Sequence, residues 1–275
     1  MTSVDLITSP ALAGHAERTV ESIRAFAPDA DVQVTLARPN GGTNEGDEAA
    51  TQAAWESYWS GGGHEGKWLY DAIASFYRRA IIRPAVNHFL GRTFAEGARV
   101  LHAGCGSGAV DVDAARRFQI TGLDISPLGL AEYARLHDGK VTLMLGSIFA
   151  IPAEGGSFDG IFNLGVMEHY RVDEIENILS EFNRVLRPGG HVVLYWPPAW
   201  GLSVNVLKMV HGVLKRIGRG DIQLHPPEIT HVRSRSETRG WMEAAGFSME
   251  TFYFGPRDFF THQIVVGRKQ AGRRP

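Results

Sequence analysis

Three glycines and an aspartate have the types and spacing of a nucleoside-binding site. Gly104, Gly106 and Gly108 alternate with small residues directly after a short apolar run. Glycines let a backbone approach a ligand closely, and a helix that starts just beyond such a turn offers unpaired N–H groups to a polar group. Asp124 follows Gly104 by 20 positions, at the end of a second apolar run. A carboxylate there can accept both hydroxyls of a ribose, so the spacing predicts a bound nucleoside.

The glycine loop alone does not say which nucleoside is bound. Gly104-x-Gly106-x-x-Ala109 with a later acid also fits the dinucleotide pattern in its alanine form. The same kind of loop serves NAD, FAD and S-adenosylmethionine. From the loop alone, a nicotinamide-dependent oxidoreductase and a non-catalytic nucleoside-binding scaffold therefore both stay open.

The elements that must position these residues alternate between strand and helix. Apolar runs and helical spacing predict a strand at 100–101, a helix at 109–118 and a strand at 119–125. The pattern continues with helices at 127–137, 172–186 and 237–245, and with strands at 141–145, 158–164, 191–196, 247–254 and 261–266. Such alternation predicts a parallel sheet covered on both faces. The last two strands are close enough in sequence to pair as a hairpin.

Two further segments flank this pattern, and a third interrupts it. Residues 1–46 are expected to form an appendage, with strands at 4–8 and 31–36 around a helix at 11–26 and a Gly/Asn-rich linker. The aromatic-rich residues 47–97, with a helix predicted at 67–90, are expected to act as a lid. An insertion at 198–235 carries an apolar helical face and is expected to cover the acceptor site.

The amino-acid composition limits the classes of protein to which the chain can belong. The chain has 275 residues, 44% hydrophobic and 21% charged, as in soluble globular proteins. Its one cysteine, Cys105, excludes an internal disulfide framework and a cysteine-based zinc site. Since no apolar run approaches membrane-spanning length and no signal-peptide core is seen, we expect a cytoplasmic protein.

The charge is unevenly spread along the chain. Its net value is −2, yet residues 198–275 hold 12 Lys and Arg against 6 Asp and Glu. This basic part is compatible with an anionic acceptor, and also with a weak peripheral membrane contact through residues 201–219.

Six motifs, taken in order, strongly resemble the class I S-adenosylmethionine-dependent methyltransferases. They are Val100-Leu-His-Ala-Gly-Cys-Gly-Ser-Gly108, Gly122-Leu-Asp-Ile125, Ser157-Phe-Asp-Gly-Ile161, Val166-Met-Glu-His169, Arg184-Val-Leu-Arg-Pro-Gly-Gly190 and Ala245-Gly-Phe247. The resemblance implies a Rossmann-like, doubly wound α/β fold, in which a mostly parallel seven-stranded sheet has a reversed last strand and helices on both faces. It assigns residues 98–268 to the cofactor-binding domain and leaves 269–275 as a tail.

The resemblance also implies the cofactor contacts. At the amino-acid end of S-adenosylmethionine, the expected contacts are the glycine-loop residues Gly104, Cys105, Gly106 and Ser107. The ribose and adenine contacts are expected at the ends of the next two strands, from Asp124, Ile125, Ser147 and Ile148. At the methionine end, the expected contacts come from the end of the strand at 158–164: Asn163, Leu164 and Gly165. Ser147 departs from the acid that such enzymes often carry. It can accept one hydrogen bond from the adenine amine, but without charge.

The implied activity is methyl transfer by in-line displacement to a small-molecule, sugar or lipid-linked acceptor. Nucleic acid is not the expected partner, because Asn163-Leu-Gly-Val lacks the Asn/Asp-Pro-Pro-aromatic run of base-amine methylation. No metal-ligand cluster with suitable spacing is seen. His169 is the candidate general base, with His225 and His231 behind it, whereas His102 is expected to be a hydrogen-bonded core histidine.

Overall fold

The computed structural model describes residues 2–37, 75–137, 139–201 and 229–270. The linker, most of the predicted lid, most of the predicted insertion with its apolar helix and His225, and most of the tail lie outside these ranges. Within them, no helix is long and apolar enough to cross a membrane.

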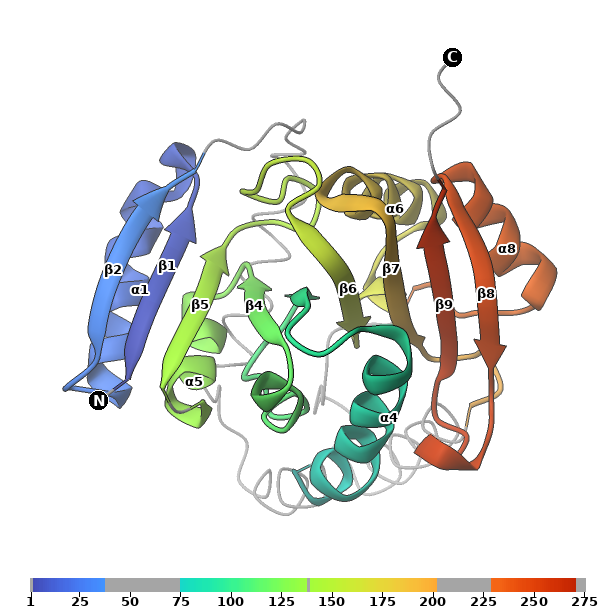
Figure 1. The fold of residues 1–275 in the computed structure, drawn as a ribbon, viewed down its shortest axis with the longest axis horizontal. Helices are drawn as coiled ribbons and strands as arrows, with labels where there is room; N and C mark the ends of the chain where they lie inside the picture. The colour runs from blue at the N-terminus through green and yellow to red at the C-terminus, as the bar shows by residue number, and fades with distance from the viewer. Residues whose placement is uncertain (1, 38–74, 138, 202–228, 271–275) are drawn as a thin grey trace, which may run out of the picture.

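A single mixed sheet forms the centre of the described fold (Figure 1). Its strands, in the spatial order β2-β1-β5-β4-β3-β6-β7-β9-β8, are all parallel to their neighbours except β9, which runs antiparallel to β7 and β8. Their bounds are β1 Ser3–Thr8, β2 Asp31–Leu36, β3 Arg99–Ala103, β4 Gln119–Asp124, β5 Lys140–Leu145, β6 Phe158–Leu164, β7 Leu186–Trp196, β8 Phe247–Tyr253 and β9 Gln263–Lys269. The predicted Rossmann-like class, the reversed last strand and the closing hairpin are confirmed.

The described sheet has nine strands rather than the seven that the resemblance implied. Strands β3 to β9 are the expected set, and β1 and β2 extend the sheet beyond β5. Val4 and Leu6 of β1 are fully buried, and Thr8 Oγ1 donates a 3.0 Å hydrogen bond to the carbonyl of Leu145. The N-terminal strands therefore cover the β5 edge, which would otherwise expose unpaired backbone groups.

Helices cover both faces of the sheet (Figure 1). Their bounds are α1 Ala13–Phe26, α4 Arg83–Thr93, α5 Pro127–Leu136, α6 Val172–Val185 and α8 Arg235–Ala244. The short π-helix η2 at Arg78–Ile82 leads into α4. Ile161 of β6 packs in one core with residues of α6 and α8. Its neighbour Phe162 packs on the opposite face, in the core that contains α4 residues. Since side chains alternate along a strand, this division follows from two successive positions.

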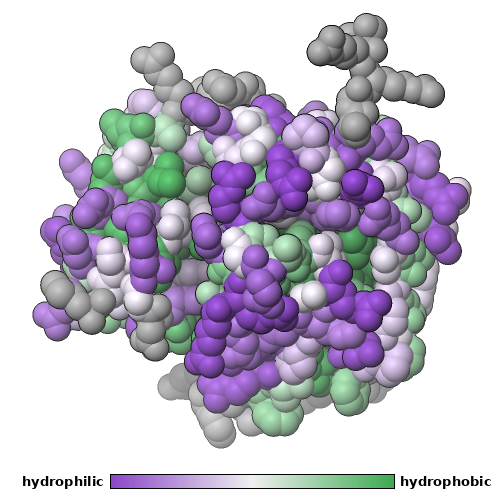
Figure 2. All heavy atoms as spheres, in the orientation of Figure 1, coloured by the Kyte–Doolittle hydropathy of each residue, from purple (hydrophilic) through white to green (hydrophobic). Residues whose placement is uncertain are grey.

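The view in Figure 2 shows a mostly hydrophilic surface. Hydrophobic residues gather at the end of the sheet formed by β1 and β2, where Val34 and Leu36 of the edge strand are exposed.

The helix predicted at residues 109–118 is wrong. The chain forms successive turns there, with a single 3₁₀ turn, η3, at Ala114–Arg116. Arg83 Nε of α4 donates to the carbonyl of Ala109 at 3.2 Å, and that carbonyl would accept an intrahelical bond in a regular helix. Asp111 is fully buried rather than placed on a helix surface. Contacts with distant elements therefore override the local helical pattern.

Candidate functional site

The glycine loop lies at the point where the strand order reverses. Strand β3 pairs with β4, the next strand in the chain, on one side and with β6 on the other. The sheet continues from β6 to β7, so the strand order reverses at β3. Ala103 at the end of β3 is in register with Asn163 near the end of β6. Ligands of open α/β sheets bind at this switch point, outside the carboxyl ends of the strands.

Close contacts and backbone conformation both require glycine in this loop. Gly104, Gly106 and Gly108 have φ values of +71°, +48° and +63°. A Cβ atom at Gly104 would collide with the side chain of Val166, and one at Gly108 would collide with the ring of Tyr133. These positions bring the loop close to the β6 turn and to α5, where any side chain would force the backbone away.

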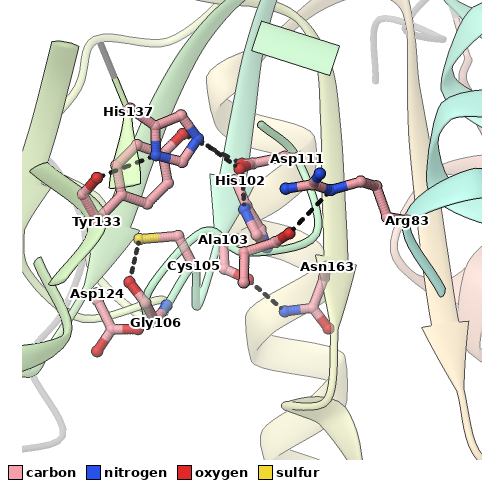
Figure 3. Close-up of polar contacts among 11 residues, drawn as sticks. Arg83, His102, Ala103, Cys105, Gly106, Asp111, Asp124, Tyr133, His137 and Asn163 are labelled. Carbon is pink, nitrogen blue, oxygen red and sulfur yellow. Dashed lines mark hydrogen bonds and ion pairs between the residues drawn. The ribbon is translucent and has the colours of Figure 1, made fainter. Parts of the chain in front are cut away.

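Asp124 at the end of β4 holds the glycine loop and keeps acceptor capacity for a ligand (Figure 3). Its Oδ2 accepts a 2.8 Å hydrogen bond from the amide of Gly106, and its Oδ1 accepts one of 2.9 Å from the amide of Ser126. The amide of Ile125 also contacts this carboxylate, and since a carboxylate has about four acceptor positions, part of its acceptor capacity remains for a ligand. Burial raises the pKa of Asp124, while the amides of Ser126 and Gly106 oppose that shift.

Asn163 links the ends of β6 and β3 beside this loop. Its Nδ2 donates to the carbonyl of Ala103 at 2.7 Å, and its Oδ1 is buried with no hydrogen-bond partner among the described residues. An unpaired buried acceptor is costly, and one at the end of a central strand suits a donor supplied by a bound ligand. Asn163, which is expected at the methionine end of the cofactor, thus lies near the end of β6, next to Leu164 and Gly165.

The remaining predicted cofactor residues lie where the sequence placed them, at strand ends. Ile125 follows β4 directly, and Ser147 and Ile148 follow β5 by two and three positions. Ser147 Oγ accepts a 3.1 Å hydrogen bond from the amide of Phe149, which shapes this turn. Cys105 is buried in the loop, and burial raises the pKa of its thiol well above the usual range. A protonated buried thiol is a poor nucleophile, so Cys105 serves as a small residue of the loop.

The candidate base His169 ends a 3₁₀ turn, η4, at Met167–His169 just after β6. Its amide donates to the carbonyl of Val166 at 3.1 Å. The preceding carbonyl, that of Glu168, accepts hydrogen bonds from the amides of Ile229 and Thr230 at 2.6 and 3.0 Å. The end of the predicted insertion is therefore anchored to the turn that carries His169.

A buried polar cluster beside the glycine loop, centred on Asp111, was not predicted from the sequence (Figure 3). Asp111 accepts from three side chains: His102 Nδ1 lies 2.7 Å from its Oδ2, the Tyr133 hydroxyl 3.1 Å from the same oxygen, and His137 Nε2 2.9 Å from its Oδ1. Burial alone would raise the pKa of Asp111, but the two histidines outweigh it and lower that pKa to about 2. The carboxylate is thus held in its ionised form.

His137 has an acceptor at both ring nitrogens. Its Nδ1 lies 3.0 Å from the carbonyl of Tyr133, and its Nε2 faces the Asp111 carboxylate. His102 is a hydrogen-bonded core histidine, stacked at 4.0 Å on Phe162, as the sequence suggested. The partners of His102 are 9 or more residues away, and no local pattern indicates them.

Comparison with known proteins agrees with this geometry. Residues 100–190, which hold the glycine loop, Asp124 and the η4 turn, match the model of the family described as Methyltransferase domain. The chain carries a class I S-adenosylmethionine-dependent methyltransferase domain. Within the described ranges, no group of three or more His, Cys, Asp or Glu is placed to hold a metal ion.

Curated relatives of this methyltransferase domain include O-methyltransferases. The chain is 34% identical over 130 residues to the ubiquinone biosynthesis O-methyltransferase of Xanthomonas oryzae pv. oryzae, a match that covers 44% of this chain and 53% of that protein. It is 30% identical over 105 residues to the O-methyltransferase rstn1 of Aspergillus nomiae, covering 36% and 46%. The chain thus spans about half the length of these relatives.

Solved structures share the fold. The magnesium protoporphyrin IX methyltransferase of Synechocystis PCC 6803, solved with bound S-adenosylhomocysteine, has a TM-score of 0.57 at 18% identity, covering 82% of this chain and 100% of that one. The 1,6-didemethyltoxoflavin-N1-methyltransferase of Burkholderia thailandensis has a TM-score of 0.52 at 18% identity, covering 85% and 95%. At this identity the likeness establishes the sheet and its connections, and nothing about the acceptor.

Proposed function

We propose that this protein is an enzyme that transfers the methyl group of S-adenosylmethionine to a small-molecule, sugar or lipid-linked acceptor. The observation that carries the proposal is the position of Asp124 at the end of β4, where it fixes the Gly106 amide and keeps acceptor capacity for a ligand. Two neighbouring ribose hydroxyls fit such a carboxylate at the end of the second strand of a Rossmann-like half. The small-molecule class is supported by relatives named for ubiquinone biosynthesis.

The residues present suit S-adenosylmethionine in chemical type. Asp124 would hold the ribose hydroxyls, and Ile125 and Ile148 would contact the adenine. Ser147 would accept one hydrogen bond from the adenine amine. Ser107 and the glycines before it would contact the amino-acid end, and the buried Oδ1 of Asn163 is an acceptor near the expected position of its ammonium group.

The chemistry of the bound cofactor is an electrophilic methyl group on a sulfonium. The work of the chain is then to align an acceptor atom in line with the sulfur and to exclude water. His169, five residues beyond β6, is the candidate base from the sequence for an acceptor that must lose a proton. His231 lies near the anchored end of the insertion, and His225 lies outside the described residues.

The proposal is tested by binding and turnover on the full chain. Calorimetric titration should give micromolar-scale affinity for S-adenosylmethionine or S-adenosylhomocysteine and no binding of NAD. Mass spectrometry of reactions with candidate acceptors should detect S-adenosylhomocysteine. Binding of NAD in place of S-adenosylmethionine would overturn the proposal in favour of an oxidoreductase. Tight S-adenosylmethionine binding without turnover across a broad acceptor screen would instead favour a non-catalytic scaffold.

A further inference from the structure

A second polar cluster lies outside the cofactor loop, between η5 (Pro256–Asp258) and the start of β9. Asp258 is fully buried, and its Oδ2 accepts from the amide of His262 at 2.7 Å and lies 3.1 Å from His262 Nδ1. Its Oδ1 has no hydrogen-bond partner among the described residues. A buried carboxylate left half satisfied is unfavourable for stability, and such groups are retained where they serve a function.

The reversed direction of β9 brings this cluster to the ligand edge of the sheet. Gln263, the first residue of β9, pairs with Trp196, the last residue of β7. One step further along, Ile264 pairs with Tyr195, which in turn pairs with Leu164 of β6. Adjacent strands are about 4.8 Å apart, so the start of β9 lies roughly 10 Å across the sheet from the end of β6. His262 therefore lies beside the carboxyl ends of the strands that carry the proposed methyl site.

Two other segments approach the same place. The buried hydroxyl of Tyr77, directly before η2, lies near Thr261 and Asp258, and burial raises the pKa of that hydroxyl. Gly201, in the first residues of the predicted insertion, is so close to the carbonyl of Thr261 that an added Cβ would lie 3.1 Å from it. Tyr77 of the predicted lid segment and Gly201 at the start of the insertion thus both lie against the β8–β9 loop, next to His262.

The loop is held in an unusual conformation to form this cluster. Phe259 and Phe260 both have left-handed backbones, with φ values of 56° and 57°. Such a conformation costs a non-glycine residue on the order of 1 kcal/mol and is concentrated at functional sites. The Thr261 hydroxyl donates to the Asp258 carbonyl at 2.6 Å, and the Phe260 amide to the Gly255 carbonyl at 3.0 Å. These bonds fix the bend that lets His262 reach the Asp258 carboxylate.

We propose that His262, in place of the sequence candidate His169, is the general base for a hydroxyl-bearing acceptor, and that Asp258 is the positioning residue that fixes its tautomer. The inference rests on the proposed methyltransferase activity and names its acceptor class. Donation from Nδ1 to Asp258 leaves the lone pair on Nε2, the arrangement by which a carboxylate prepares a histidine as a base. Among the described residues, Tyr195 packs edge-on against this ring with centroids 6.3 Å apart, and Tyr77 lies near Asp258 and Thr261 across the loop.

The proposed step balances in atoms and charge. The acceptor oxygen forms a bond to the methyl carbon while the sulfur–carbon bond breaks, and its electron pair stays on sulfur as a neutral thioether. The hydroxyl proton passes to Nε2 of His262 and then to water. Removal of this proton by a positioned base contributes about 10² to 10⁴ in rate.

The first test needs no known acceptor. Nitrogen-15 NMR of the full chain with labelled histidine reports which ring nitrogen of His262 holds the proton, and the spectrum of His262→Asn assigns the signal. The proposal expects the neutral ring to be protonated at Nδ1. A neutral ring protonated at Nε2 would overturn the assignment of His262 as base.

The second test compares two matched probes, catechol and 1,2-phenylenediamine. A neutral aromatic amine attacks with its own lone pair, whereas a hydroxyl must lose its proton. His262→Asn keeps a donor for Asp258 but removes the base, so kcat with catechol should fall about 10²-fold or more, and kcat with the diamine by less than about threefold. The rising limb of the catechol pH profile should also disappear. Asp258→Asn should lower the catechol rate with the same selectivity.

His191→Asn is the matched control, because His191 lies in the middle of β7, about five residues before the ligand end at Trp196, and faces Glu250 at 3.4 Å. It should leave both rates unchanged. An equal loss on both probes in His262→Asn, or no loss on either, would overturn the proposal. Failure of the methyltransferase activity itself would appear separately, as absence of S-adenosylmethionine binding by the wild-type chain. If the wild type turns over neither probe, the tautomer measurement decides.

Discussion

His137 Nε2 lies 2.9 Å from Oδ1 of Asp111, although 26 residues separate them in the sequence. The contact joins the end of α5 to the turns that follow the glycine loop. His137 Nδ1 also lies 3.0 Å from the carbonyl of Tyr133, so both of its ring nitrogens face an acceptor. The turns that follow the loop proposed to hold the cofactor are thus held by a buried carboxylate and its hydrogen bonds rather than by a regular helix.

Asp111→Asn should destabilise the protein by about 3 kcal/mol or more. The amide nitrogen cannot accept a hydrogen bond, so one histidine or the Tyr133 hydroxyl loses its partner in a fully buried place. Removing one member of a buried ion pair typically costs about 3–5 kcal/mol. Urea unfolding followed by circular dichroism measures the change. Asp113→Asn is the control, since this half-exposed residue pairs with Arg83 at 3.8 Å and its loss should cost less than about 1 kcal/mol.

The same carboxylate should give the protein a measurable acid dependence. Folding lowers the pKa of Asp111 from its ordinary value of 3.8 to about 2, because of the two histidines, so the folded state favours its ionised form. That contribution, on the order of 2 kcal/mol, is fully present above about pH 4 and is lost as the pH falls towards 2. The stability difference between wild type and Asp111→Asn should therefore narrow between pH 5 and pH 2.5. A difference that stays constant over this range would contradict the assignment.

Strand positions were predictable because apolar runs and alternating apolar residues leave a local pattern in the sequence. The strands predicted at residues 31–36 and 158–164 agree with β2 and β6 at both ends. The positions of Asp124 and Asn163 at strand ends followed directly. The attachment of β1 to β5 was not predictable, because it joins residues more than 130 positions apart and the expected fold already had seven strands.

Polar contacts between distant elements account for the other differences. The pattern at residues 109–118 fits a helix, but the bond from Arg83 to the Ala109 carbonyl and the burial of Asp111 depend on α4 and α5. No local signal reports such contacts. The four-residue spacing of Asp258 and His262 before the last strand was visible in the sequence, yet only the reversed direction of β9 places that pair at the ligand edge.

Gly104→Ala should impair both folding and cofactor binding. The new methyl group would collide with Val166, and the residue would keep a positive φ of 71°. Gly139→Ala is a matched control, because Gly139 has a φ of +85° but nothing within 4 Å of an added Cβ. It should show only the backbone cost of about 1 kcal/mol, with cofactor affinity intact. Equal effects of the two variants on calorimetric affinity would mean that close packing at Gly104 is unimportant.

The most direct test of the account is S-adenosylmethionine binding to Asp124→Asn, measured by calorimetry beside the wild type and Asp159→Asn. Asp159 is a carboxylate near the start of β6 that contacts Arg99 and Arg187, at the opposite end of that strand from the site. Two charge-assisted hydrogen bonds are each worth about 1.5–3 kcal/mol, and 1.4 kcal/mol is tenfold in Kd. The account predicts that Kd rises about 100-fold or more in Asp124→Asn and stays within about twofold in Asp159→Asn. Unchanged affinity in a folded Asp124→Asn protein would contradict it.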